Sequence, residues 1–521
     1  MESMEISHMN NMEKIWLDGL ASNAFSKLKT LVVEHCEKLS SIFSSYTMLT
    51  RFQTLEKITV TDCGSLEVVF HVQEFNFSEA RTSIFQLREL VLTRLPKMKQ
   101  VWSDNHQGGL TYGRLRCMEV VKCERLKSLF PSSVAKSMTQ LEQLLVSSCG
   151  VEEIIAEEDG VDMSANDLFF PRLTDLRLLG LPNLRSFYRN SHTSTWPILK
   201  QLRVRHCGKR RSFSFASEIR RCHGSTTSDQ RALFSFEKVI PNLKGLTLMR
   251  EDIMMMMQQQ FIFGNLKELE LACYHDENVV FPSDFLLHRF PDLEVLSLSC
   301  SSLEEIFPKD AFGHGGSTPY GELIDVETPF GALRNLKQLE LNMLCKLQRV
   351  WKDGSLIAEI LKQIESLLVS ECSGLPIIFP SPVAFQRLTK LEVKGCAGLV
   401  HMGTCSAMPS LVHLAWLILR DCGKMEDVVT DDGNEVEEIS FPKLRMLELD
   451  GLPSLESFSP TNCAFSFPLL RQIIVKLCPK MNIFCNGALS TPILHGVFLV
   501  DKNYEKRWEG DLNTTIQSLS T

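Results

Sequence analysis

The feature that most constrains this chain is a pattern of apolar residues that returns along nearly its whole length. In two early copies, apolar or cysteine residues lie at the same seven offsets, 0, 3, 5, 8, 11, 14 and 15. The first copy is Leu28, Leu31, Val33, Cys36, Leu39, Ile42 and Phe43, and the second is Leu55, Ile58, Val60, Cys63, Leu66, Val69 and Phe70. Chance does not produce seven matching offsets, so the chain is built from a repeated structural unit.

The same frame recurs to give about sixteen units. The residues at offset 0 are Leu28, Leu55, Leu87, Leu115, Leu141, Leu173, Leu199, Leu243, Leu266, Leu293, Leu336, Ile364, Leu388, Leu414, Leu444 and Leu470. Most units are 23 to 32 residues apart, and two intervals are stretched to 44 and 43 residues. This period lies mainly within or just above the range of leucine-rich repeats.

The offsets themselves predict the architecture. Offsets 3 and 5 alternate with period 2, which places them on the buried side of a short strand, while offsets 2, 4 and 6 face the other way. A single unit of this size is too small to bury its own apolar residues, so neighbouring units must stack and share one elongated core. We therefore predict an α/β solenoid, a curved leucine-rich-repeat superhelix with a parallel β-sheet on its concave face. The convex segments are expected to be mostly irregular or short helices, as at 131–138, where a serine could cap the first turn.

Interruptions of the frame suggest four segments. Residues 1–208 form the first run of repeats and begin part-way through a unit, because Met9, Met12, Ile15 and Trp16 match offsets 8, 11, 14 and 15. Residues 209–262 form an irregular, stretched segment in which loops are expected, including the tract 254–260. Residues 263–500 resume the repeats, and 501–521 form a C-terminal cap or tail. The incomplete first unit leads us to expect either a partial gene model or the tail of a longer protein.

Composition and motifs argue against several classes of function. The 55 Lys and Arg against 63 Asp and Glu give a formal net charge of -8, which does not favour nucleic acid or an anionic membrane as a partner. Nine of the 17 cysteines occupy offset 8, where they are expected to be buried, reduced and structural. These are Cys36, Cys63, Cys123, Cys149, Cys207, Cys372, Cys396, Cys422 and Cys478. The sequence holds no C-x-x-C, H-E-x-x-H or G-x-S-x-G motif, so we expect no catalytic site, no metal and no cofactor.

Two forms of the repeat resemble a known group of proteins. Some units read L-x-x-L-x-L-x-x-C-x-x-L, as at 55–66, and others end in Leu-Pro, as at 95–96, 181–182 and 452–453. With the ending at 508–516, they resemble the repeat region of plant coiled-coil nucleotide-binding leucine-rich-repeat (NBS-LRR) disease-resistance proteins, over nearly the whole chain. The resemblance implies recognition of a pathogen effector or a guarded host protein, and restraint of a nucleotide-binding domain. The first residues lack the basic and apolar regions of a signal peptide, and no apolar run is long enough to span a membrane, so we expect a location in the cytoplasm or nucleus. The sequence has no G-x-x-x-x-G-K-[ST] phosphate loop, so this chain alone is not expected to bind or hydrolyse ATP.

Two other readings of the repeats remain open. A leucine-rich-repeat substrate adaptor of a ubiquitin ligase, or another cytosolic scaffold, would also use such units, although no F-box segment is visible in the sequence. An extracellular receptor would be expected to carry a signal peptide and asparagine at offset 8, where this chain has cysteine.

The candidate binding residues are those at offsets 2, 4 and 6, because they form a regular array that has no part in the core. Nine of them carry charged or aromatic side chains suited to a protein ligand: Lys57, Asp175, Arg177, Arg203, Arg205, Lys390, Glu392, Trp416 and Arg420. Arginine and tryptophan are enriched among binding hot spots, so the four arginines and Trp416 are the strongest candidates. Two acidic inserts, at 157–159 and 431–435, are expected to be solvated loops.

Overall fold

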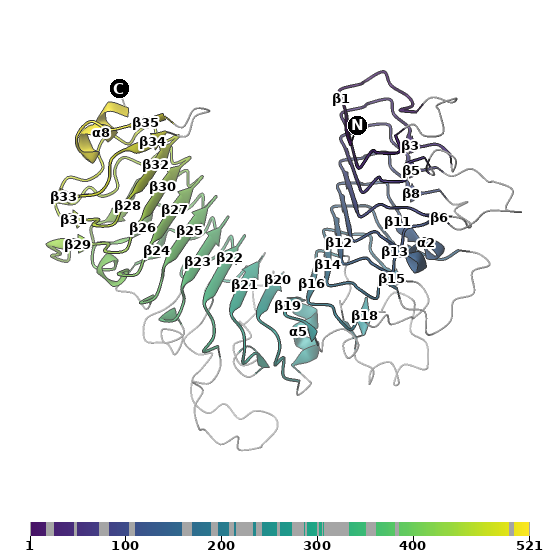
Figure 1. The fold of residues 1–521 in the computed structure, drawn as a ribbon. Coiled ribbons are helices and arrows are strands. Elements are labelled where there is room, and N and C mark those ends of the chain that lie inside the picture. Colours follow the sequence, from purple (N-terminus) through teal and green to yellow (C-terminus); the bar gives the residue numbers. More distant parts are fainter. Residues whose placement is uncertain are drawn as a thin grey trace, which may run out of the picture. The chain divides into compact units, whose positions relative to one another are not determined.

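The computed structural model describes residues 2–16, 25–45, 49, 51–71, 83–103, 110–158, 169–188, 196–207, 213–214, 233–235, 242–257, 261–272, 286, 289–299, 302–304, 306, 333–350, 361–380, 385–499 and 505–519. The chain divides into two compact units, Met1–Ile253 and Met254–Thr521. Figure 1 shows each unit as a stack of short, parallel strands joined by outer segments.

The N-terminal unit is built on one main parallel sheet. Its strands are β1 (Ser3–Ser7), β2 (Thr30–Glu34), β4 (Lys57–Thr61), β7 (Glu89–Thr93), β10 (Cys117–Val121), β12 (Gln143–Ser147), β14 (Asp175–Leu179), β16 (Gln201–Arg205) and β19 (Gly245–Met249). Each strand pairs in parallel with the next strand of this series. Shorter outer strands add a second layer: β3 (Ser41–Phe43), β5 (Val68–Phe70) and β8 (Gln100–Trp102) form one small sheet, and β11 (Ser128–Pro131), β13 (Glu153–Ala156) and β15 (Ser186–Tyr188) form another.

The C-terminal unit repeats this plan. Its main strands are β20 (Glu268–Ala272), β21 (Val295–Ser299), β22 (Gln338–Asn342), β23 (Ser366–Ser370), β25 (Lys390–Lys394), β27 (Trp416–Arg420), β30 (Met446–Asp450), β32 (Gln472–Lys476) and β34 (Val497–Leu499). Its outer strands form two small sheets, one of β24 (Ile377–Phe379), β26 (His401–Thr404) and β28 (Asp427–Thr430), the other of β29 (Glu438–Ser440), β31 (Ala464–Ser466) and β33 (Leu489–Ser490). A 3-10 turn, η5 (Met408–Ser410), follows β26.

The predicted leucine-rich-repeat solenoid is confirmed, and the frame read from the sequence locates its strands. In all sixteen predicted units the strand of the main sheet begins at offset 2 and ends at offset 6. Residues at offsets 3 and 5 are buried and those at 2, 4 and 6 are mostly half-exposed, as in β4, where Ile58 and Val60 point inward. The incomplete first unit also provides a strand, β1, at the offsets that Met9 and Trp16 predict.

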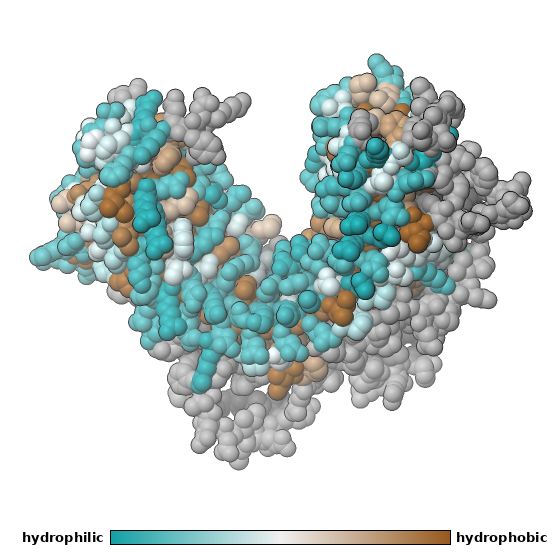
Figure 2. Space-filling model, viewed as in Figure 1, coloured by the Kyte–Doolittle hydropathy of each residue, from teal (hydrophilic) through white to brown (hydrophobic). Residues whose placement is uncertain are grey.

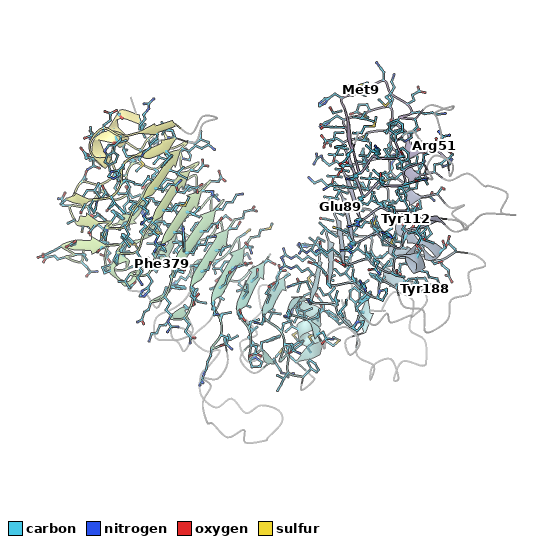
Figure 3. The ribbon with its side chains drawn as sticks, in the orientation of Figure 1. Met9, Arg51, Glu89, Tyr112, Tyr188 and Phe379 are labelled. Carbon is cyan, nitrogen blue, oxygen red and sulfur yellow. The ribbon has the colours of Figure 1, made fainter. Side chains whose placement is uncertain are left out.

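The core continues from unit to unit through aromatic residues at offset 15. In the N-terminal unit Phe43 stacks on Phe70 with ring centroids 5.6 Å apart, and Phe70 stacks on Trp102 at 5.9 Å. Trp102 in turn lies 5.5 Å from Phe130. Tyr112, labelled in Figure 3, contacts Phe70 and Trp102 of this column and is fully buried. Each unit is too small to bury its apolar residues alone. These contacts between successive units join them into one common core.

A left-handed residue follows many of the strands, at offset 7. His35, Asp62 and Arg94 have φ of 52°, 53° and 53°, and Gly180 and Gly451 have φ of 60° and 68°. This backbone conformation turns the chain sharply from the sheet toward the outer segment. Because residues other than glycine, asparagine and aspartate rarely adopt it, the repeat itself, rather than local preference, imposes the turn.

Two expectations for the outer segments are wrong in detail. Helix α2 (Ser132–Ser137) is present, but its N-terminus at Pro131 has no capping side chain of its own. The carboxylate of Glu158 accepts hydrogen bonds from the Ser133 backbone N–H at 2.7 Å and from the Ser132 hydroxyl at 2.9 Å. Part of the first acidic insert is therefore a structural cap, since a carboxylate satisfies the free N–H groups at a helix start.

The methionine tract 254–260 is expected to be a loop, but its first residues are helical. Residues Arg250–Met256 form helix α5, and Asp252 near its start is fully buried. The Asp252 carboxylate accepts hydrogen bonds from the backbone N–H groups of Phe213 and Met249, both at 3.2 Å. Most of the remainder of 209–262 lies outside the described residues, as do 258–260 of the tract, 159 of the first acidic insert and 501–504 of the tail.

The C-terminal end of the solenoid is covered by a short strand and a helix. Strand β35 (Glu505–Arg507) runs antiparallel to β34, and helix α8 (Leu512–Leu519) buries Leu512 and Ile516. Asn513 fastens the helix to the last turn, because its side-chain oxygen accepts from the Phe484 and Cys485 N–H groups and its amide donates to the Cys485 carbonyl.

Candidate protein-binding face

We define the exposed sheet face of each unit as the side chains at offsets 2, 4 and 6 of its main strands. All nine residues that the sequence singled out lie on it: Lys57 on β4, Asp175 and Arg177 on β14, Arg203 and Arg205 on β16, Lys390 and Glu392 on β25, and Trp416 and Arg420 on β27. The space-filling view shows the mainly hydrophilic surface of both units, interrupted by hydrophobic patches (Figure 2).

In the N-terminal unit two of the candidate residues, Arg177 and Asp175, are paired with each other. Arg177 binds Asp175 through two hydrogen bonds, Nε to Oδ1 at 2.9 Å and Nη2 to Oδ2 at 2.6 Å. Arg203 lies opposite Arg177 in the strand register, so these two guanidinium groups occupy neighbouring positions of the face. The Asp175 carboxylate reduces the repulsion between them.

Lys57 stands apart from this cluster. Its ammonium group lies 2.7 Å from the carboxylate of Glu89 on the adjacent strand β7, in the same register row. Both side chains are more than a third exposed, at 43% and 37%. Figure 3 labels Glu89 on the sheet side of the N-terminal unit. An ion pair this open to water is weak and easily exchanged for a contact with a ligand.

In the C-terminal unit the candidates belong to one charge network. Arg420 binds Glu448 on β30 through two hydrogen bonds, Nε to Oε1 at 2.7 Å and Nη2 to Oε2 at 2.8 Å. Its third nitrogen lies 3.5 Å from Glu392, which Lys390 also contacts at 2.8 Å. The hydrogen bond to Glu448 raises the pKa of Arg420, so the guanidinium remains charged.

Trp416 forms the apolar part of the same region. It lies in register between Lys390 on β25 and Met446 on β30, and 41% of its surface is exposed. Ile418, two residues on, is nearly buried at 9%. A large, half-exposed aromatic ring held on a strand beside the paired Lys390 is a favourable anchor for a protein ligand, because little conformational entropy remains to be lost.

Sequence reasoning missed two members of this face, Glu448 and Glu89. Glu448 forms an ion pair with Arg420, and Glu89 forms one with Lys57. Glu448 occupies offset 4 of the strand that follows Arg420, so an alignment of the repeats could have placed it next to the arginine. Its burial, with only 9% of its side chain exposed, could not have been read from the sequence.

The offset-8 cysteines lie beneath the ends of the main strands. Eight of them are at most 6% exposed, while Cys478 is only half-buried, contrary to expectation. Their thiols donate to backbone carbonyls, as from Cys63 to Thr61 at 3.5 Å, and burial raises the pKa of Cys63 to about 11. The Cys63 thiol is therefore protonated and serves as a packing group.

Within the described part of the chain, no group of three or more His, Cys, Asp or Glu residues is arranged to hold a metal ion. None of the helices described there has the length and the apolar character that crossing a membrane requires.

The stacked strands, the buried offsets and the exposed face define a leucine-rich-repeat solenoid. The family model described as "Plant disease resistance protein RPS2-like, leucine-rich repeats" matches residues 1–150, 242–386 and 382–486. The chain therefore belongs to this family of plant disease-resistance repeats, as the sequence patterns suggested.

Three Arabidopsis thaliana proteins are similar over shorter segments. Probable disease resistance protein At1g61190 is 34% identical over 122 residues, which are 22% of this chain and 12% of that protein. Probable disease resistance proteins At5g47260 and At4g27220 are 31% and 28% identical, over 19% and 25% of this chain and 10% and 14% of their own lengths. The chain thus matches about an eighth of each relative. Among solved structures, a chain of the Drosophila Toll–Spätzle complex matches at 13% identity and a TM-score of 0.32. The match covers 91% of this chain and 57% of the chain in that complex.

Proposed function

We propose that this chain is a non-catalytic protein-recognition solenoid, the effector-sensing and autoinhibitory repeat region of an intracellular plant immune receptor that acts in the defense response. Its ligand is a pathogen effector or a guarded host protein, and its second partner is the nucleotide-binding domain of a full-length receptor. We place it in the cytoplasm or the nucleus. Membership in the disease-resistance repeat family supports this proposal, since such repeats generally mediate protein interactions.

The observation that carries the proposal is the region around Trp416. The exposed indole lies beside Lys390 in the register, and two residues further along the strand Arg420 is fixed by Glu448 and Glu392. Tryptophan and arginine are among the residue types most enriched at binding hot spots. The charges are already paired, so a ligand must match or exchange them, and the face thereby discriminates between ligands.

A photo-crosslinking experiment tests the proposal. The full chain is expressed in plant cells with benzoylphenylalanine in place of Trp416, and in a control with the same group in place of Lys99, an exposed residue outside the main sheet. We expect light-dependent protein adducts from position 416 and not from position 99. The proposal fails if adducts form equally at both positions, or if position 416 yields none while the variant remains folded.

A further inference from the structure

Two cysteines outside the offset-8 series lie close together on the outer side of the C-terminal unit. Cys405 directly follows β26 and Cys463 directly precedes β31. They are separated by 58 positions in sequence, yet their sulfur atoms are only 4.0 Å apart. A disulfide bond requires about 2.05 Å between the sulfurs, so a shift of about 2 Å, within the range of side-chain rotation, would join them.

The surroundings of this pair differ from those of the offset-8 cysteines. Cys405 is buried, with 1% exposed, and its thiol donates to the Thr461 hydroxyl at 3.7 Å. Cys463 is half-exposed, and its thiol donates to the Val436 carbonyl at 2.8 Å. Cys463 is therefore the more accessible of the two residues to a small reagent in solution, and the Cys405 thiol lies next to it in the interior. Cysteines that respond to oxidants are often arranged in this way. One thiol is accessible to the oxidant, and a second thiol beside it, the resolving thiol, then forms the disulfide.

We propose that Cys405 and Cys463 form a reversible disulfide when the protein meets a peroxide, which makes this pair a redox modification site. The Cys463 thiolate attacks one oxygen of hydrogen peroxide, and the O–O bond breaks to leave Cys463 as a sulfenic acid and release hydroxide. The Cys405 sulfur then attacks the Cys463 sulfur, the S–O bond breaks, and the Cys405 proton passes to the departing hydroxide to give water. The hydroxide from the first step takes up the proton that Cys463 lost on ionising, so in total two thiols lose two electrons and one peroxide is reduced to two waters.

The environment of Cys405 sets the order of these steps. Burial raises the pKa of Cys405 to about 12, so this thiol remains protonated and is a poor first nucleophile toward peroxide. The partly exposed Cys463 therefore reacts with the peroxide first, and Cys405 acts only on the sulfenic acid beside it.

The disulfide would connect two separate outer sheets. Cys405 is attached to the sheet β24–β26–β28, and Cys463 to the sheet β29–β31–β33. The closed loop contains the strands β27, β28, β29 and β30, including Trp416 and Arg420. A bond that closes so long a loop restricts the unfolded chain and makes this part of the solenoid harder to open.

The test uses the full chain treated with hydrogen peroxide, blocked with iodoacetamide and mapped by mass spectrometry without reduction. We expect one cross-linked peptide pair joining Cys405 to Cys463, two hydrogens lighter than the reduced pair and removed by dithiothreitol. The oxidised protein should melt about 5 °C or more above the reduced protein. Cys405→Ser should leave a sulfenic acid at Cys463 that dimedone traps, whereas Cys463→Ser should leave Cys405 unmodified.

A matched control is Cys485→Ser, which removes another buried thiol of the same unit, one that donates to the Gly487 carbonyl, and should leave the cross-link intact. The proposal is overturned if oxidised, still folded wild-type protein yields Cys405 and Cys463 as separately alkylated peptides. It is equally overturned if Cys463 proceeds to sulfonic acid while Cys405 stays a free thiol. Because the mapping of the wild-type chain is decisive by itself, the test does not depend on the folding of the variants.

Discussion

Removal of Arg420 should destabilise the C-terminal unit as well as weaken binding. Glu448 has only 9% of its side chain exposed, and Arg420 supplies both of its charged hydrogen bonds, at 2.7 and 2.8 Å. Breaking a buried pair by deleting one partner costs about 3–5 kcal/mol, but Arg420 is itself 35% exposed, so water can partly replace it. We therefore expect Arg420→Ala to lower the free energy of unfolding by about 2–3 kcal/mol.

The assay is urea unfolding followed by far-ultraviolet circular dichroism, with hydrogen exchange of the peptides that contain β27 and β30 to localise the effect. Lys57→Ala is the matched control, since the Lys57–Glu89 pair is exposed on both sides and should contribute less than about 1 kcal/mol. The double variant Arg420→Met with Glu448→Met should recover much of the lost stability, because no charge is then left buried and unpaired. Equal stability of the Arg420→Ala and Lys57→Ala proteins would refute the reasoning.

Three further outcomes follow from contacts in the structure. Cys396→Ser should lower the free energy of unfolding by about 1–3 kcal/mol in urea titrations, because a serine hydroxyl on a shorter bond cannot reach the carbonyls 3.6 and 3.9 Å from the sulfur. Asn513→Ala should lower the local stability of helix α8 by about 1–3 kcal/mol, because the hydrogen bonds to the last turn are lost. Amide hydrogen exchange in α8 should then become faster, while exchange in the N-terminal unit stays unchanged. The hydrogen bond from Arg94 holds the pKa of Asp62 below its ordinary value of 3.8. The stability that this ion pair contributes is therefore present above pH 3.8 and is lost as the pH falls through the lower pKa of the folded state. Melting curves between pH 2 and 6 should therefore fall more steeply for the wild type than for Arg94→Gln.

The repeat made the strands of this protein predictable almost residue by residue. Each unit repeats one burial pattern, so an error in one unit is corrected by its neighbours, and offsets 2 to 6 become strand in all sixteen. The nine candidate residues could be assigned to the exposed sheet face for the same reason, since the side chains of a strand alternate strictly between its two faces.

Features that depend on contacts between units could not be read in this way. The cap of α2 is supplied by Glu158, which belongs to the outer segment of the following unit, and Asp252 of helix α5 accepts a hydrogen bond from the backbone N–H of Phe213 in the preceding unit. The left-handed residues at offset 7 include His35, Arg94 and Leu477, whose types do not favour that conformation. In each case the tertiary arrangement outweighs local sequence preference.

Cys478 illustrates the same limit within a regular unit. It occupies offset 8 like the buried cysteines, yet it is half-exposed. The pairing of Arg420 with Glu448 needed both the register of β27 on β30 and the depth of the carboxylate, and only the first is encoded in the spacing.

The most direct test of the recognition face is a binding measurement on the protein captured from position 416. Affinity would be determined by calorimetry for the wild type and for Trp416→Ala and Arg203→Ala, with thermal melting as the check on folding and Val204→Ala as a core control that should unfold its repeat. We expect at least one face variant to weaken binding by about 2 kcal/mol or more while its melting temperature stays close to that of the wild type. Normal binding by both face variants, together with loss of binding on changes in the acidic segments 157–167 or 426–438, would contradict it and assign recognition to the loops.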